Sequence, residues 1–223
     1  MPESTIAVPL DGWRDPASVF AAIAAPEAHS FWLDAGPDAT TGWSWVGTGV
    51  VEEHPERVRS VPLTPSRGPW EAGRFRGGWV GWLGYEDAAR RAGAPISDAD
   101  TPVPAERWLR VELFVAFDHE RRRVWAIAPA TEAHAFAARV AGTADELVVP
   151  DPPPLVATSR HAPADYAALI ERCRDAIREG DAYQLCLTTR FTITGEVDPV
   201  AAFARLRSRT PAHHGGLVRS GDT

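Results

Sequence analysis

The sequence predicts an α+β protein in which antiparallel β-sheets are flanked by helices. Short apolar segments lie in pairs on either side of turn residues, as they do in antiparallel hairpins. Two Asp-Pro dipeptides, Asp15-Pro16 and Asp198-Pro199, predict helix starts, because the carboxylate can cap the helix and proline suits its first turn. Five prolines between residues 143 and 163 indicate a linker with a second structural unit beyond it.

The first part of the chain predicts a helix and then a β-hairpin. Residues 17–25 follow the Asp15 cap and stop at Pro26, which favours a short helix. Residues 30–34 and 43–51 surround a segment of turn residues and predict two paired strands. Residues 54–73 carry four prolines and predict mostly loop.

The next segments predict a buried strand, a second hairpin and a helix. Residues 75–85 are apolar and rich in glycine, which suits a strand that other backbone approaches closely. Further on, alternation places four side chains on one face of a strand: Val111, Leu113, Val115 and Phe117. A turn over 118–123 leads to a returning strand over 124–128, and Thr131 is expected to cap a helix that reaches Val140.

Beyond the prolines, residues 166–177 have apolar side chains at helical spacing, and Gly180 is expected to end that helix. Residues 183–193 alternate between apolar and polar and predict a strand. The helix that begins at Asp198-Pro199 is expected to end near Arg209. A strand over 215–219 and a turn over 220–222 complete the prediction.

These elements predict an N-terminal domain over residues 1–142, a Pro-rich linker over 143–163 and the start of a second domain over 164–223. The last strand enters a turn with no returning partner, and an unpaired strand edge is a poor end for a domain. We therefore expect the chain to be the N-terminal portion of a longer protein. A frayed tail on a complete domain is the alternative.

The composition excludes several classes of function. The 223 residues carry a net charge of −7, and no segment is basic enough to follow nucleic acid or an anionic membrane. All 23 basic residues are arginine, which rules out a Schiff-base lysine in this chain. Two cysteines, Cys173 and Cys186, are too few for a disulfide scaffold or a zinc site. Because the start does not read as a signal peptide, we expect a cytoplasmic protein.

Two features indicate possible binding sites. Gln184, Thr188 and Arg190 share the polar face of the predicted strand and could face a cleft, with Arg190 suited to a carboxylate; the alternative is a solvated outer face. Trp43 and Trp45 share a strand face beside small residues, which can form the wall of a pocket for a flat ligand; the alternative is core packing. The pattern alone leaves both questions open.

Three segments, in chain order, carry a family resemblance. The first is Ser30-Phe31-Trp32-Leu33-Asp34 followed by Gly42-Trp43-Ser44-Trp45-Val46-Gly47. The second is Gly77-Gly78-Trp79-Val80-Gly81-Trp82-Leu83-Gly84-Tyr85-Glu86. The third is Ile177-Arg178-Glu179-Gly180-Asp181-Ala182-Tyr183-Gln184-Leu185-Cys186-Leu187-Thr188, and Arg209-Thr210-Pro211-Ala212 continues the match. These segments resemble the chorismate-utilising enzymes, and most of all component I of 4-amino-4-deoxychorismate synthase.

Within that superfamily, anthranilate synthase component I is the nearest alternative. It usually has aspartate at the position of Glu86 and phenylalanine at the position of Tyr183, so both residues favour the aminodeoxychorismate branch. The resemblance implies an anthranilate synthase component I-like fold, with residues 164–223 as the start of the chorismate-binding catalytic domain.

The resemblance also implies an activity. Enzymes of this kind add an amino group to chorismate at C4, with ammonia from a separate or fused glutamine amidotransferase, on the way to 4-aminobenzoate and folate. Their catalytic residues and Mg²⁺ ligands match positions beyond Thr223. The resemblance therefore implies Mg²⁺ for the full-length enzyme, with no metal ligand and no catalytic residue in this chain, which we expect to be inactive alone.

The N-terminal half of such enzymes can hold tryptophan. The matching positions here are Ala35, Gly42, Trp43, Ser44, Pro211, Ala212 and His213. Two departures weaken the expected binding, because Ala35 replaces a serine hydroxyl and Gly42 replaces a common arginine, and each lost polar contact costs about 1 kcal/mol. A non-catalytic module that binds tryptophan or another small molecule is the alternative from a different class.

Overall fold

The structure, a computed structural model, describes residues 5–61, 70–94, 103–143, 149–151 and 154–221. The chain divides into two compact units, one formed by Met1–Val149 with Ala202–Thr223 and the other by Pro150–Ala201. All strand pairs are antiparallel among the described residues, and helices accompany the strands in both units. The predicted α+β class is therefore confirmed.

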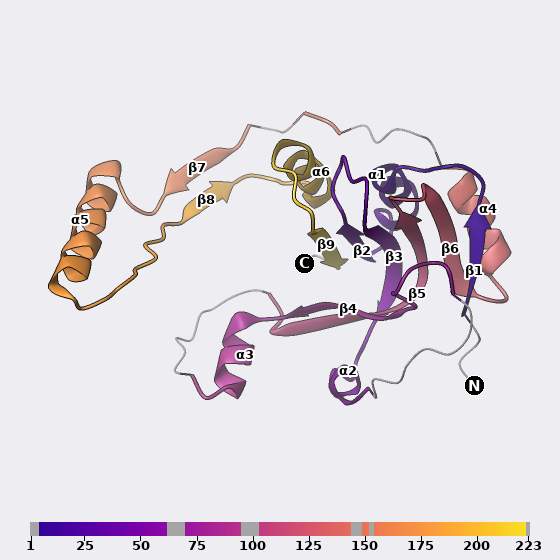
Figure 1. The fold of residues 1–223 in the computed structure, drawn as a ribbon, viewed down its shortest axis with the longest axis horizontal. Helices are drawn as coiled ribbons and strands as arrows, with labels where there is room; N and C mark the ends of the chain where they lie inside the picture. The colour runs from indigo at the N-terminus through magenta and orange to yellow at the C-terminus, as the bar shows by residue number, and fades with distance from the viewer. Residues whose placement is uncertain (1–4, 62–69, 95–102, 144–148, 152–153, 222–223) are drawn as a thin grey trace. The chain divides into compact units, whose positions relative to one another are not determined.

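The larger unit is built on a seven-stranded sheet (Figure 1). Its strands are β1 (Thr5–Leu10), β2 (His29–Asp34), β3 (Trp43–Val51), β4 (Gly78–Leu83), β5 (Glu106–Asp118), β6 (Arg123–Pro129) and β9 (Gly215–Ser220). They lie in the order β1-β6-β5-β3-β2-β9, and β4 pairs with β5 outside this path. The two predicted hairpins are confirmed as β2–β3 and β5–β6.

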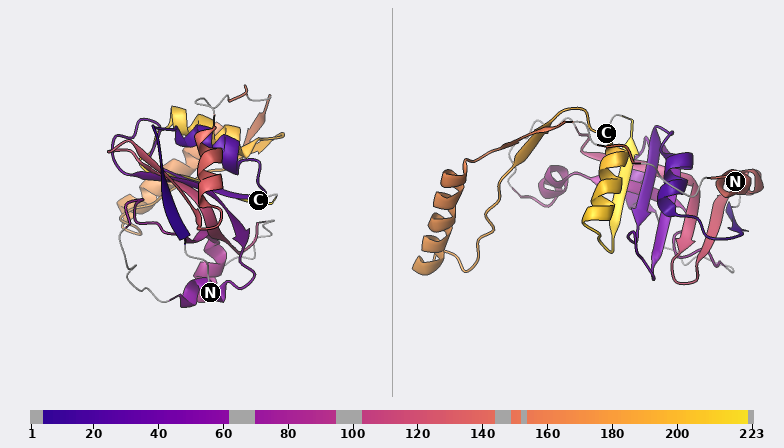
Figure 2. Two further views of the ribbon diagram at one scale, coloured as in Figure 1. Left: turned by 90° about the vertical axis from the view of Figure 1, so that its right-hand side faces the viewer. Right: turned by 90° about the horizontal axis from the view of Figure 1, so that it is seen from above.

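Three helical segments pack on one face of this sheet. α1 (Pro16–Val19) continues into the π-helix η1 (Phe20–Ala24), and the predicted cap is confirmed because the Ala17 N–H donates to Asp15 Oδ1 at 2.8 Å. α4 (Ala133–Ala141) packs on β6 and β1, and its N-cap residue is Glu132 instead of the predicted Thr131. α6 (Pro199–Arg209) begins after Asp198, whose Oδ1 accepts from Val200 N–H at 2.9 Å, as predicted. Seen from above, α1 and α6 lie in front of the strands (Figure 2).

The two faces of the sheet bury different side chains. On the helix-covered face, the Trp32 ring packs between Phe20 and Phe203, with ring centroids 5.4 and 5.0 Å away. The opposite face carries a second cluster, made of Phe31, Ala72, Val80, Val111, Phe114, Ala116, Trp125 and Ile127. Trp43 and Trp45 pack against this cluster. β3 therefore turns its two indoles away from the helices.

The predicted alternation in β5 is wrong at one point. Thr48 pairs with Leu113, but the next residue, Gly49, pairs with Val111, so Glu112 is an extra residue in a β-bulge. Val111 consequently joins the cluster of Phe114 and Ala116, and it does not share a face with Leu113. An apolar pattern does not reveal a bulge, because the extra residue looks like one more step of the alternation.

Two short helices were not predicted. α2 (Glu56–Ser60) lies inside the predicted loop, part of which, residues 62–69, is outside the described residues. α3 (Tyr85–Arg91) begins where the predicted strand over 75–85 ends, and β4 occupies only Gly78–Leu83. Within β4 only Val80 is buried, so this strand is less enclosed than expected.

The last strand differs most from its prediction. β9 pairs with β2 along its whole length, from Gly215 opposite Asp34 to Ser220 opposite His29, so it has a partner that the sequence did not indicate. Gly221 follows with φ 64° and donates to Ala28 O at 2.9 Å, while Asp222 of the predicted turn lies outside the described residues. Because of this pairing, residues 202–223 belong to the larger unit, and the compact units differ from the predicted division at 163.

The smaller unit contains β7 (Val156–Ser159), α5 (Pro163–Glu179) and β8 (Phe191–Thr194). α5 and its end at Gly180, with φ 86°, agree with the prediction. β7 pairs with β8, so the predicted linker contains a strand; its prolines 152 and 153 lie outside the described residues. The predicted strand over 183–193 is wrong before Phe191. Only Phe191–Thr194 pairs with β7 and forms the strand β8.

Within the described ranges, no helix combines the length and the apolar character needed to cross a membrane.

Gly47 in β3 tests how tightly the sheet is packed. A Cβ at this position would lie 2.6 Å from both Leu113 O and Phe114 Cβ. We expect Gly47→Ala to lower the free energy of unfolding by about 2 kcal/mol, because the overpacked strand must shift. Gly216→Ala in β9 is the matched control, since its Cβ would meet nothing closer than 3.5 Å. Equal midpoints for the two variants in urea denaturation would contradict this packing.

Candidate functional site

A cavity of about 340 Å³ lies where the β2–β3 connection meets the segment before β9. Its lining residues are Ala35, Asp38, Ala39, Thr40, Thr41, Gly42, Trp43, Trp45, His213 and His214. The volume lies within the range of small-molecule pockets. The hydroxyls of two threonines, one carboxylate and two imidazoles give this cavity polar groups beside its two indoles.

The structure brings together four of the seven residues predicted for a tryptophan pocket. Ala35, Gly42, Trp43 and His213 line the cavity. Ser44 is fully buried, but alternation along β3 turns it to the helix-covered face.

Pro211 and Ala212 are exposed and do not line the cavity. The Ala212 backbone nevertheless lies next to the cavity loop, because a Cβ added to Gly36 would come within 2.9 Å of Ala212 O.

The two indoles combine core packing with a place in the cavity wall. The rings of Trp43 and Trp45 stack at 6.4 Å with an interplanar angle of 15°, and Trp43 also stacks on Trp125 at 5.5 Å. Both pack against the core, and both line the cavity. The Trp45 Nε1–H is buried and has no acceptor among the described residues, so it is a donor that a polar ligand group could satisfy.

A buried ion pair lies behind the cavity, on the helix-covered face. Arg207 Nε of α6 donates to Asp34 Oδ2 at 2.8 Å, and the two side chains are 12% and 2% exposed. Arg207 Nη2 also donates to Gly36 O at 3.2 Å. The second carboxylate oxygen accepts from Trp32 Nε1 at 3.2 Å. These hydrogen bonds connect α6 to the start of the β2–β3 loop, residues 35–42, which forms one wall of the cavity.

Ser44 and His119 extend the network to the other end of the loop. Ser44 Oγ lies 2.8 Å from His119 Nε2 and 3.3 Å from Asp34 Oδ1, and it accepts from Ala35 N–H at 3.0 Å. The backbone N–H of His119 donates to Gly42 O at 3.1 Å. The Ser44 side chain therefore holds the start of the loop 35–42, and the His119 backbone holds its end.

The imidazole of His119 is kept neutral by its surroundings. Burial lowers the pKa of His119 below its ordinary value, and the Arg207 and Arg122 guanidiniums lower it further. The Asp34 carboxylate and a hydrogen bond to the Ala39 backbone oppose this shift without reversing it. A neutral imidazole can share its hydrogen bond with Ser44 without adding a charge beside Arg207.

Sequence reasoning found Ser44 but missed Asp34, His119 and Arg207 as parts of one site. His119 lies in a run of charged residues over 118–123, and Arg207 is one of three arginines over 205–209, so neither stands out in the sequence. Arg207 is also 173 residues away from Asp34. The only available signal was that Asp34 ends a strand whose pattern buries its side chain.

The other predicted site residues, Gln184, Thr188 and Arg190, belong to the smaller unit. All three side chains are exposed, and none lies in a strand. The shared strand face is not formed among these residues, and their role in a cleft stays a prediction.

This chain belongs to the chorismate binding enzyme family, whose model matches residues 11–223. The aminodeoxychorismate synthase of Streptomyces pristinaespiralis is 31% identical over 189 residues, covering 77% of this chain and 26% of that protein. The anthranilate synthase component 1 of Streptomyces coelicolor is 28% identical over 238 residues, covering 91% and 46%. The crystal structure of anthranilate synthase component I from Streptococcus pneumoniae aligns with a TM-score of 0.48 and 20% identity over 95% of this chain and 47% of that chain. The family resemblance is confirmed, and the chain spans between about a quarter and a half of these relatives.

The titration of His119 tests the buried network. Since its pKa is lowered in the folded state, the unfolded chain binds more protons once the pH falls below about 6.5. The free energy of unfolding is therefore unaffected by this group at higher pH and decreases as the pH drops through that value. We expect the wild type to lose more stability than His119→Gln between about pH 7.5 and pH 5.5. Parallel stability curves in chemical denaturation would contradict the neutral, buried state of His119.

Proposed function

We propose that this chain is part of component I of an aminodeoxychorismate synthase. The enzyme would replace the C4 hydroxyl of chorismate with an amino group, using ammonia from a glutamine amidotransferase that is separate or fused, on the way to 4-aminobenzoate and folate. The observation that carries the proposal is the family match over residues 11–223, joined with similarity to named aminodeoxychorismate synthases. Glu86 and Tyr183 support this branch of the family.

The described residues hold the N-terminal sheet and its cavity, and they do not account for the chemistry. Nowhere in the described ranges do three His, Cys, Asp or Glu side chains form a group that could hold a metal ion. The described residues therefore do not fit a Mg²⁺ site, and we derive no step through this ion. We propose that the Mg²⁺ ligands and the catalytic residues belong to parts of the protein that these 223 residues do not include.

Anthranilate synthase component I is the second candidate, because the Streptomyces coelicolor relative aligns with 91% of the chain. The two candidates differ in the carbon of chorismate that receives nitrogen. The aminodeoxychorismate branch leads to 4-aminobenzoate, whereas the other branch yields the 2-amino isomer.

The first experiment reads the source gene across codon 223 and assays two proteins. The 223-residue chain and the longest reading frame that contains it are each incubated with chorismate, ammonia, Mg²⁺ and an aminodeoxychorismate lyase. We expect 4-aminobenzoate from the longer protein and none from the short chain, because the short chain lacks the catalytic residues. Anthranilate as the main product would favour the second candidate, and turnover by the short chain would contradict the division of roles.

A non-catalytic module that binds tryptophan is the candidate from another class. The cavity beside Trp43 and Trp45, with the buried Trp45 Nε1–H, favours it. The loss of the serine hydroxyl at Ala35 argues against it. Gly42 has φ 83°, a conformation that other residues rarely adopt, so the arginine common at this position would be strained here.

Calorimetry with L-tryptophan separates these candidates. We expect Ala35→Ser to bind L-tryptophan about fivefold more tightly than the wild type, because a hydroxyl at the cavity wall restores one hydrogen bond. Ala138→Ser, on the exposed side of α4, is the matched control and should bind like the wild type. Micromolar binding by the wild type would support the module, and identical affinities for Ala35→Ser and the wild type would contradict the role given to Ala35.

A further inference from the structure

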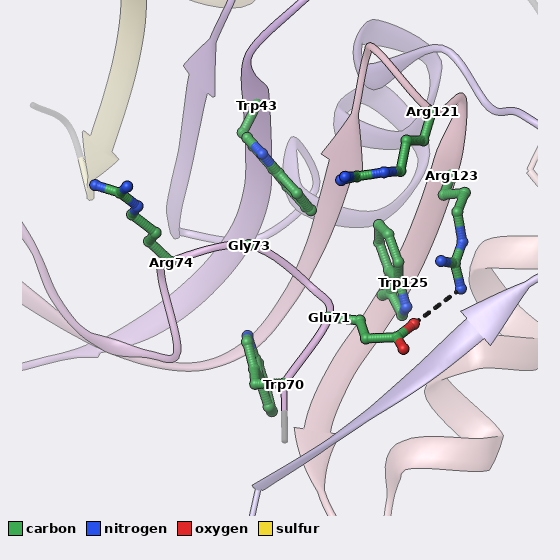
Figure 3. Close-up of a pocket in the computed structure, with 8 residues that line it drawn as sticks. All are labelled: Trp43, Trp70, Glu71, Gly73, Arg74, Arg121, Arg123 and Trp125. Atoms are coloured by element: carbon green, nitrogen blue, oxygen red, sulfur yellow. Dashed lines mark hydrogen bonds and ion pairs between the residues drawn. The ribbon is translucent and has the colours of Figure 1, made fainter. Parts of the chain in front are cut away.

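A second cavity, of about 540 Å³, lies on the face of the sheet that the helices do not cover (Figure 3). Arg123 pairs with Glu71 at 3.2 Å, and Arg121 pairs with Asp118 at 3.1 Å, so the arginines that face this cavity already have partners. Only Trp43 also lines the first cavity. The open hydrogen-bonding groups of this sheet lie along its edges instead, where a strand has a neighbour on one side only. The residues that line the second cavity are Trp43, Trp70, Glu71, Gly73, Arg74, Arg121, Arg123 and Trp125.

Three strands of the sheet have one edge without a partner strand among the described residues, namely β1, β9 and β4. β1 contains Pro9, which has no N–H, and β9 contains Arg219, whose charge a further strand would cover. β4 contains neither a proline nor a charged residue over its six positions, Gly78–Leu83. Natural edge strands avoid such a sequence, because it pairs readily with another strand. The edge of β4 is therefore the one best suited to accept a further strand.

Hydrogen bonds establish which backbone groups of β4 are open. The Gly84 N–H donates to Ala105 O at 2.6 Å, so the backbone of Gly84, next to the end of β4, faces β5. Backbone direction alternates along an antiparallel pair, so the even-numbered residues of β4 also face β5. On the other side of β5, the Glu52 N–H donates to Trp108 O at 2.8 Å, which agrees with this alternation. The residues that turn their N–H and C=O groups to the open edge are Trp79, Gly81 and Leu83.

The sequence of β4 is complementary to itself in an antiparallel pair. With Val80 opposite Val80 of the partner subunit, Trp79 lies opposite Gly81 of the partner subunit. The open backbone groups of these two residues then meet as a hydrogen-bonded pair. In the same register Trp82 lies opposite Gly78 of the partner subunit. Each large ring thus lies beside a glycine that leaves room for it, and no two like charges come together.

We propose that β4 pairs with β4 of a second copy of this chain, in antiparallel register about Val80, and joins two sheets edge to edge. Both copies use the same edge, so the pairing closes at a dimer and leaves no open β4 edge. One strand pair buries a small area, which implies a weak dimer with a micromolar dissociation constant. The dimer does not depend on the function proposed above, because β4 contributes no residue to the first cavity and no catalytic group.

Sedimentation velocity of the 223-residue chain over a concentration series measures this dissociation constant. Trp79→Pro removes one open N–H from each copy, and we expect it to raise the dissociation constant at least about tenfold. An edge strand tolerates such a proline, because the lost N–H does not bond to β5. Leu83→Lys should also weaken the dimer, since a charge at the edge must lose water on pairing. Val50→Lys in β3 is the matched control for Leu83→Lys, because the two side chains are 54% and 42% exposed, and it should change nothing.

Amide hydrogen exchange locates the paired edge within the dimer. We expect the N–H groups of Trp79 and Gly81 to become protected as the concentration rises, whereas those of Val80 and Trp82 are protected throughout by β5. The proposal is overturned if the chain stays monomeric up to about 0.5 mM, or if it forms assemblies larger than dimers. It is also overturned if a dimer forms without protecting Trp79 and Gly81, or if Leu83→Lys and Val50→Lys give the same dissociation constant.

Discussion

The ion pair between Asp34 and Arg207 is the interaction on which the rest of the larger unit depends. Burying a carboxylate costs several kcal/mol unless it is paired and hydrogen-bonded, so Asp34 at the end of β2 requires a partner. Its oxygens accept from the Arg207 guanidinium, the Trp32 indole and the Gly36 N–H. Only the guanidinium comes from a distant part of the chain. The pair therefore selects which α6 residue faces the sheet.

Two structural consequences follow from this choice. With Arg207 fixed, the chain after α6 enters β9 in register with β2, so that Gly215 lies opposite Asp34. His213 and His214, just before that strand, then come to the wall of the first cavity. The loop 35–42 on the other wall is held by the same network through Gly36 O, Ala35 N–H and Gly42 O. The cavity is thus a product of a contact between residues far apart in the sequence.

Local signals were sufficient for much of the fold. The Asp15 and Asp198 caps, the β2–β3 and β5–β6 hairpins and the end of α5 at Gly180 each depend on neighbouring residues, and each was predicted. The Glu112 bulge and the β2–β9 pairing depend on a partner strand, and the sequence does not show the partner. Residues 183–190 alternate like a strand, but alternation becomes a strand only where backbone groups have a neighbour to pair with.

The candidate site was predicted only in part for the same reason. The family resemblance led to Ala35, Gly42, Trp43 and His213, which do line the cavity. It did not lead to Asp34, His119 or Arg207, because their role is to hold the loop and not to meet a ligand. Trp43 lines both cavities and packs against the core, so the tryptophan-rich face of the sheet combines packing with two cavities.

The most direct test of this account is a double-mutant cycle on the ion pair. The free energy of unfolding is measured by urea denaturation for the wild type, Asp34→Asn, Arg207→Gln and the double variant. A pair that organises the larger unit should give a coupling energy of about 2 kcal/mol, because either single change leaves the other charge buried without its partner. Additive effects, with a coupling energy below about 0.5 kcal/mol, would show that α6 and β9 are placed by other contacts and would contradict the central role of this ion pair.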